Sequence, residues 1–246
     1  MPESSTTASN VVWDIIRYVF VAVATGVLVW YCCFYTPTVY VSREHTGKTM
    51  ETDYIVKVVR LPEQTDWKKV ADEIQSKLDA LEKQIDSEKL FARLEPPTLK
   101  KTVSELAIDF SAIVKGCAVD CIAELLEEKK IHDYMIEIDG RERYRGKKNK
   151  DKNWIAGIEK PMREDSNEFL GLQQKLALCD QSLATFRSVS VVAPNCTSAD
   201  AWANVLFTLG EQKGIELANE HGISVLFLLR NGDEIIEVPS EHWQRH

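Results

Sequence analysis

The chain has 246 residues and a formal net charge of -8, from 38 acidic and 30 basic side chains. Binding to nucleic acid needs a basic face that neutralises phosphates, so this acidic balance argues against a nucleic-acid partner. Hydrophobic residues make up 44% and charged residues 28% of the chain, as in an ordinary globular protein.

The N-terminal segment contains an uncharged apolar stretch at 18–35. Its length is about the minimum for crossing the hydrocarbon core of a bilayer. A cleaved signal peptide is the alternative, but no small-x-small cleavage site follows the stretch. The predicted organisation is therefore an N-terminal tail at 1–17, a transmembrane anchor at 18–40 and one globular domain at 45–246.

The first half of the globular part has clear helix and strand patterns. Residues 53–60 alternate and are rich in β-branched side chains, which predicts a strand. Apolar residues recur at steps of three and four over 67–85, which predicts a helix. A second helix is expected after Gly116. Short strands are expected at 134–138, 142–145, 154–158, 176–178 and 188–193.

The C-terminal part predicts one more helix and a hairpin. Thr197 opens the helix, and the strand at 223–229 is expected to pair with 234–238 across the Asn231-Gly232 turn signal. Because Thr185 and Phe186 carry no turn signal, the two strands around them are expected to run on as one. Helices and strands without regular βα alternation predict the α+β class, with a mixed sheet and packed helices preceded by one transmembrane helix.

Two local features are interpreted as structural rather than functional. The basic run at 141–150 is interpreted as a solvated turn between strands rather than a phosphate-binding patch. Cys117 and Cys121 lie four residues apart on a predicted helix and are interpreted as small buried side chains rather than a redox pair. The chain has six cysteines but no CxxC pair, so no zinc or thioredoxin-like site is predicted.

Four ordered segments resemble the ApbE-like family, the FAD:protein FMN transferases. The most specific is AIDFSAIVKGCAVD at 107–120, which is similar to the family's LDLSAIAKGYAVD. The others are TGKTMETDY at 46–54, a strand and glycine turn leading to WIAGIEKP at 134–161, and the closing helix and strand at 189–234. The resemblance implies a shortened version of that family's fold.

The resemblance also implies a magnesium site. In the family, FMN passes from FAD to a threonine or serine hydroxyl, and a divalent cation stabilises charge on the phosphate. By motif match the metal ligands would be the backbone carbonyl of Ala112 with the side chains of Asp200 and Asn204. The alternative for Asp200 is a capping-box-like pair with Thr197 at a helix start, which needs no metal.

Three further positions match family residues that contact FAD. They are Met50 near the flavin, and Asp109 and Lys115, whose ammonium could neutralise diphosphate charge. The alternatives are that Lys115 and Gly116 belong to an ordinary loop before a helix and that Asp109 is simply solvated.

The chain departs from the family pattern where the chemistry resides. The SGDY-like motif, the acid-base aspartate loop and the HIIDP-like segment are absent, because residues 178–185 lead directly to Phe186. A long stretch after Arg93, with a flavin-stacking aromatic residue, is also missing, and Glu51 replaces a glycine. A hydroxyl nucleophile without a positioned base is weak at neutral pH.

Two functions therefore stay open. The first is a magnesium-dependent FAD:protein FMN transferase, with FAD as substrate and an acceptor flavoprotein as partner. The second is a non-catalytic membrane-anchored scaffold, or a weak nucleotide- or metal-binding protein, that keeps the fold. The missing segments could reflect natural loss or an incomplete gene product. In either case the apolar stretch at 18–35 predicts a single-pass membrane protein, and the resemblance implies that its globular domain lies on the periplasmic or extracytoplasmic side.

Overall fold

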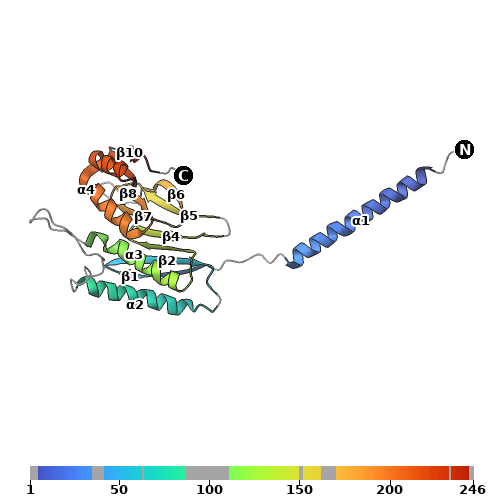
Figure 1. Cartoon of the computed structure of the whole chain (residues 1–246), viewed down its shortest axis with the longest axis horizontal. Helices are drawn as coiled ribbons and strands as arrows, with labels where there is room; N and C mark the ends of the chain where they lie inside the picture. Colours follow the sequence, from blue (N-terminus) through green and yellow to red (C-terminus); the bar gives the residue numbers. More distant parts are fainter. Residues whose placement is uncertain are drawn as a thin grey trace, which may run out of the picture. The chain divides into compact units, whose positions relative to one another are not determined.

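The computed structural model describes residues 5–34, 42–62, 64–86, 111–149, 152–161, 170–232 and 234–243. The chain divides into two compact units, 1–40 and 41–246. The first unit contains the helix α1 (Ser5–Phe34) (Figure 1).

Within the described residues, no helix combines the length and the apolar character needed to cross a membrane. The transmembrane anchor predicted at 18–40 stays a prediction, and its last part, 35–40, lies outside the described residues.

The second unit is built on an eight-stranded sheet in the order β1-β2-β3-β4-β7-β8-β9-β10. Every neighbouring pair is antiparallel, so the α+β prediction is confirmed but the mixed sheet is wrong. Tight turns join β1 to β2, β3 to β4, β7 to β8 and β9 to β10, and such turns produce antiparallel pairs. The strands are β1 (Ser42–Thr49), β2 (Thr52–Val59), β3 (Tyr134–Ile138), β4 (Arg141–Arg145), β7 (Gln181–Phe186), β8 (Val189–Ala193), β9 (Ser224–Asn231) and β10 (Glu234–Pro239).

Three helices pack against this sheet (Figure 1). They are α2 (Trp67–Asp86), α3 (Ser111–Glu128) and α4 (Cys196–Glu220). α2 and α3 cover β2 and β3 through a buried core that includes Tyr54, Ile122 and Ile136. α4 covers β7 to β9 through a second core that includes Ala203 and Phe227. The sheet therefore presents α3 and α4 side by side over its central strands.

A separate two-stranded sheet of β5 (Trp154–Glu159) and β6 (Leu172–Leu178) packs near β4. The rings of Tyr144 and Trp154 lie 6.4 Å apart, and Trp154 Nε1 donates a hydrogen bond of 3.0 Å to the Arg145 carbonyl. Side chains alternate along β4, so Arg141 and Arg143 point to the opposite face, toward α3 and α4. The first half of the basic run at 141–150 is thus an inner strand, and its interpretation as a solvated turn is wrong.

Other local predictions need correction. α3 begins at Ser111, so Lys115 and Gly116 lie inside a helix rather than in a loop before it. β7 and β8 do not run on as one strand, because Phe186 pairs with Val189 across a two-residue turn. Arg187 in this turn has φ of 53°, a left-handed conformation that glycine usually supplies. The turn therefore had no glycine signal to reveal it.

The predicted cysteine pair is also placed differently. Cys117 and Cys121 are free and partly exposed on α3 rather than buried. A contact with the Cys117 thiol lowers the pKa of Cys121 to about 7, although burial opposes this shift.

Gly116 marks the closest approach of α3 to α4. A Cβ atom placed there would lie 2.7 Å from the Cys196 carbonyl oxygen and 2.8 Å from the Asp200 Cβ. Only glycine fits at this distance without moving a backbone. This contact sets the spacing of the two helices.

We predict that Gly116→Ala destabilises the fold. Alanine gains about 1 kcal/mol of helix propensity over glycine, but overpacking typically costs about 1–3 kcal/mol, and here it also pushes Asp200 from its partners. Urea unfolding followed by circular dichroism measures the net change. Glu124→Ala, on the exposed part of the same helix, is the control and should change stability by less than about 0.5 kcal/mol. A Gly116→Ala protein as stable as the wild type would contradict this account.

The opposite face of β4 carries a titratable carboxyl group. Burial raises the pKa of Glu142 to about 7; the Tyr144 hydroxyl lowers it, and the nearby charges of Glu137 and Glu159 raise it. Tyr144 donates its hydrogen bond to Glu142 Oε2 at 2.6 Å.

We predict that stability falls as pH rises toward neutrality. The folded pKa of Glu142 lies above its ordinary value of 4.5, so between these values the folded state binds more protons than the unfolded state. The free energy of unfolding then decreases with pH across that window, by about 1–3 kcal/mol. Glu142→Gln should flatten this part of the profile in denaturation curves from pH 4 to 8. A slope unchanged by the substitution would exclude Glu142 as its source.

Candidate functional site

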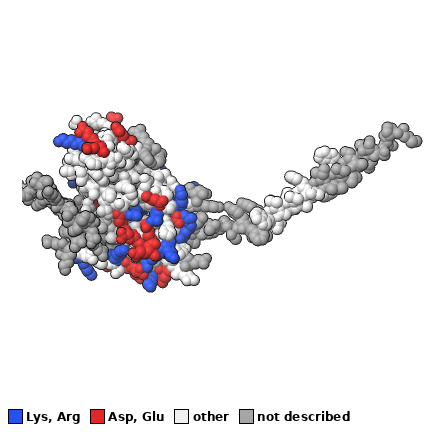
Figure 2. Space-filling view, in the orientation of Figure 1, with Lys and Arg blue, Asp and Glu red and all other residues white. Residues whose placement is uncertain are grey.

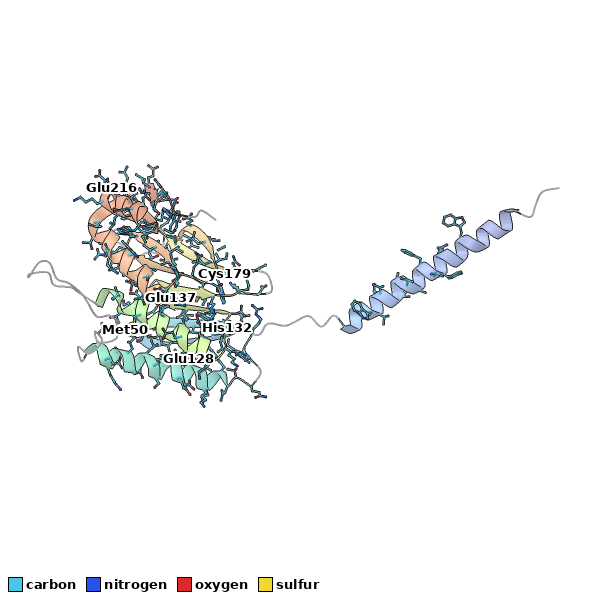
Figure 3. The ribbon with its side chains drawn as sticks, viewed as in Figure 1. Met50, Glu128, His132, Glu137, Cys179 and Glu216 are labelled. Carbon is cyan, nitrogen blue, oxygen red and sulfur yellow. The ribbon has the colours of Figure 1, made fainter. Side chains whose placement is uncertain are left out.

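One end of the sheet gathers turns that are distant in the sequence. Tyr54 pairs with Ile138, which puts the β1–β2 turn with Met50 at the same end as the β3–β4 turn. The Thr185 amide donates to the Gly140 carbonyl at 2.9 Å, which adds the β7–β8 turn. Figure 3 shows Met50 at the opposite end of the globular unit from His132. Most of the predicted site residues lie toward the Met50 end.

Asp200 of α4 lies at this end of the sheet, where it contacts both α3 and β4. Its side chain is 0% exposed, and it projects from the first turns of α4 toward α3 and β4. The Gly116 amide of α3 donates to Oδ2 at 3.1 Å, and Arg141 Nε of β4 donates to Oδ1 at 2.9 Å. Asp200 thus joins three elements through its two carboxylate oxygens.

Arg141 is the basic partner in this arrangement and is itself only 7% exposed. Its Nη1 also donates to the Asp139 carbonyl at 2.7 Å, and the same atom lies 3.5 Å from Asp139 Oδ2. Sequence reasoning did not single out Arg141. The only signals were its place at the start of the basic run at 141–150 and just before the strand predicted at 142–145, because its partner Asp200 lies 59 residues away.

The charge state of Asp200 reflects two opposing effects. Burial raises the pKa of the Asp200 carboxyl, whereas Arg141, the Gly116 amide and Lys115 lower it, leaving the pKa above its ordinary value. A carboxylate removed from water needs such partners to remain ionised. The contact with Arg141 therefore favours the ionised form of Asp200.

The other predicted metal ligands lie close by. Ala112 is in the first turn of α3, and in a regular helix its carbonyl faces the Gly116 amide, which also donates to Asp200. Asn204 directs Nδ2 toward the Asp200 carbonyl oxygen at 2.8 Å and toward Oδ1 at 3.2 Å. The structure thus brings Ala112, Asp200 and Asn204 together.

These residues do not fit a magnesium ion. Magnesium requires several oxygen ligands in octahedral array, but both Asp200 oxygens accept N–H groups and one faces a guanidinium. No three or more His, Cys, Asp or Glu residues in the described part of the chain are arranged to hold a metal. The site is instead a closed ion pair.

The predicted flavin-contacting residues are only partly placed. Lys115 forms an ion pair with Asp139 at the β3–β4 turn. Met50 is partly buried and packs against the core under α2 and α3. Asp109 lies outside the described residues. The positive charge of Lys115 thus lowers the pKa of Asp200, but the Asp139 carboxylate already neutralises Lys115.

The capping-box alternative for Asp200 is wrong. Asn195 is the N-cap of α4, and its side chain accepts the Ser198 amide at 2.8 Å. Thr197 instead donates through Oγ1 to Asp120 at 2.6 Å.

Asp120 is a structural residue that sequence reasoning missed. It accepts the Cys196 amide at 3.0 Å and the Thr197 amide at 2.8 Å, and it pairs with Arg143 at 2.5 Å. Asp120 therefore fixes the start of α4, whose first turns carry Asp200.

Acidic side chains gather over the α2–α3 part of the surface in Figure 2, with basic ones beside them.

A surface pocket of about 190 Å³ lies elsewhere, between β6, β8 and the C-terminal segment. It is below the usual range of ligand sites, and none of its lining residues was predicted to bind metal or flavin. Asp180 is among them. Because Arg141 pairs with Ala184, Asp180 lies about 13 Å along β7 from that position, so it cannot serve as a base beside Asp200.

Comparison with known proteins identifies related sequences. The ApbE family model matches residues 54–186 and 181–227. The FAD:protein FMN transferase of Haemophilus influenzae is 27% identical over 191 residues, covering 65% of this chain and 54% of that protein. The Vibrio cholerae transferase is 29% identical over 181 residues, covering 61% and 53%. The chain thus spans about half the length of these curated relatives.

Solved structures share the fold. The flavin transferase ApbE from Vibrio cholerae superposes with a TM-score of 0.66 at 21% identity, covering 83% of this chain and 98% of that one. The apo form of the Pseudomonas stutzeri flavinyl transferase gives 0.65 at 19% identity, covering 82% and 95%.

We predict that Asp200→Asn strongly destabilises the protein, because it removes the buried carboxylate that pairs with Arg141 and leaves this guanidinium with the more distant Asp139 Oδ2, 3.5 Å from Nη1. Breaking a buried pair in this way costs about 3–5 kcal/mol. Adding Arg141→Met should recover part of the loss. A double-mutant cycle in urea measures the coupling. Simple addition of the two single effects would show that the residues do not interact.

Proposed function

This chain belongs to the ApbE family, and we propose that it is a non-catalytic member that keeps the flavin-transferase fold without the transfer reaction. The observation that carries the proposal is the two-residue turn between β7 and β8, where Phe186 pairs directly with Val189. The family resemblance places an acid-base aspartate loop in this part of the chain. The tight turn leaves no residues there to form it.

The carboxylates around Asp200 do not replace that base. Asp139 is paired with Lys115, and Asp120 is committed to Arg143 and the start of α4. General-base assistance is typically worth about 10²–10⁴-fold in rate. A hydroxyl nucleophile at this end would therefore react slowly even with FAD bound.

The second candidate is a magnesium-dependent FAD:protein FMN transferase that acts on a threonine or serine of an acceptor protein. It is favoured by the family match and by the placement of Met50, Lys115, Asp200 and Asn204 toward one end of the fold. In both candidates FAD is the proposed nucleotide, and the proposed location is the extracytoplasmic side.

An assay of flavin transfer separates the candidates. The full chain is mixed with FAD, magnesium and an acceptor domain that an active relative modifies, and covalent flavin is followed by in-gel fluorescence and mass spectrometry. We expect a rate at least about 10²-fold below that of the relative assayed in parallel, from the loss of the base. Transfer at the relative's rate would establish the transferase instead.

FAD binding is measured separately, by quenching of flavin fluorescence. Binding without transfer identifies a nucleotide-binding member. Neither binding nor transfer identifies a scaffold.

A further inference from the structure

We propose that Arg141 is the resident cation of the Asp200 site and makes this site independent of divalent metal. The inference rests on the proposed function only in taking this end of the fold as the one related to the family's metal position. Its evidence is the set of contacts that Arg141 makes and the burial of Arg141 and Asp200.

The first step is that Asp200 already has the charge partner that burial demands. The carboxylate is 0% exposed, and Arg141 Nε donates to its Oδ1 at 2.9 Å. A guanidinium remains charged at any accessible pH, and its planar donors match a carboxylate. Asp200 is therefore neutralised by the chain itself.

The second step is that Arg141 is held in this position at both ends of its side chain. Its backbone directly follows the Asp139-Gly140 turn, in which both residues have positive φ, of 48° and 74°. The Gly140 amide is bound by Glu137 Oε1 at 3.0 Å. At the far end, Nη1 is bound by the Asp139 carbonyl at 2.7 Å. The arginine therefore cannot swing away without breaking these bonds.

The third step is that an aromatic ring packs beside Arg141. The Arg141 guanidinium carbon lies 5.8 Å from the centre of the Phe186 ring, and Phe186 meets Phe207 edge to face at 5.2 Å. Arg187 lies over both rings, at 5.9 Å and 5.3 Å. Arg141 and Asp200 are only 7% and 0% exposed, and this burial strengthens their ion pair.

The fourth step is the local balance of charge. Asp139 and Asp200 face Lys115 and Arg141, two carboxylates against two cations. A divalent ion at Asp200 would meet the guanidinium charge at short range with no uncompensated carboxylate to hold it. Removal of Arg141 should therefore create metal affinity, which is an outcome that a purely structural arginine would not produce.

The test is manganese binding by the full chain, followed by electron paramagnetic resonance and calorimetry. The wild type and Arg187→Gln, which changes the nearby arginine over the Phe186 and Phe207 rings, should show no site tighter than about 1 mM. Arg141→Gln should bind one Mn²⁺ at least about ten-fold more tightly, through the freed carboxylate. Adding Asp200→Asn should abolish this gain.

Two results would overturn the proposal. One is a wild type that binds one Mn²⁺ as tightly as Arg141→Gln; the other is a folded Arg141→Gln protein with no gain in affinity. If that variant does not fold, the wild type still decides: a rise in its melting temperature with magnesium that Asp200→Glu changes would contradict metal independence, and a temperature unchanged by magnesium or chelator would support it.

The result is separable from the proposed function. Flavin transfer that persists in chelator would refute the non-catalytic assignment and leave the role of Arg141 intact. Stoichiometric manganese binding by a wild type that transfers no flavin would do the reverse.

Discussion

A carboxylate that loses contact with water must obtain hydrogen bonds and positive charge from its surroundings. Asp200 obtains them from a helix amide at Gly116 and from the Arg141 guanidinium. These contacts require α3, α4 and β4 to meet at one point, and the close approach of the helices in turn requires a residue without a side chain at 116. The spacing of α3 and α4 and the neutralisation of the Asp200 charge thus depend on the same set of contacts.

Two buried or partly buried aspartates at this end of the fold make contacts that hold its elements together. Asp120 of α3 accepts hydrogen bonds from the start of α4, and Asp200 of α4 accepts them from α3 and β4. Asp200 and Asn204, which were predicted as metal ligands, therefore have a structural role. Under the proposed function, the fold persists without the groups that would activate a nucleophile.

Sequence patterns predicted what depends on neighbours along the chain. The helix at 67–86 and the hairpin across Asn231-Gly232 follow from local periodicity and turn chemistry. The placement of Met50, Lys115, Asp200 and Asn204 toward one end came from the family resemblance. The antiparallel order of the sheet could not be inferred, because strand pairing is a long-range property.

The Arg141–Asp200 pair joins residues 59 positions apart, and no periodicity or motif in the sequence relates them. The turn at Arg187 was hidden for a different reason, since arginine occupies a left-handed position without the usual glycine. In both cases tertiary contacts set the conformation, and local preference did not reveal it.

The β7–β8 hairpin has a consequence for how such proteins diversify. Its strands stay paired from Phe186 and Val189 to Ser182 and Ala193, and this register depends on the strands themselves. Segments can be gained or lost at a hairpin tip while the sheet beneath it is preserved. The tip of this hairpin is therefore a suitable insertion site, where engineering or evolution could add a reactive loop without changing the sheet.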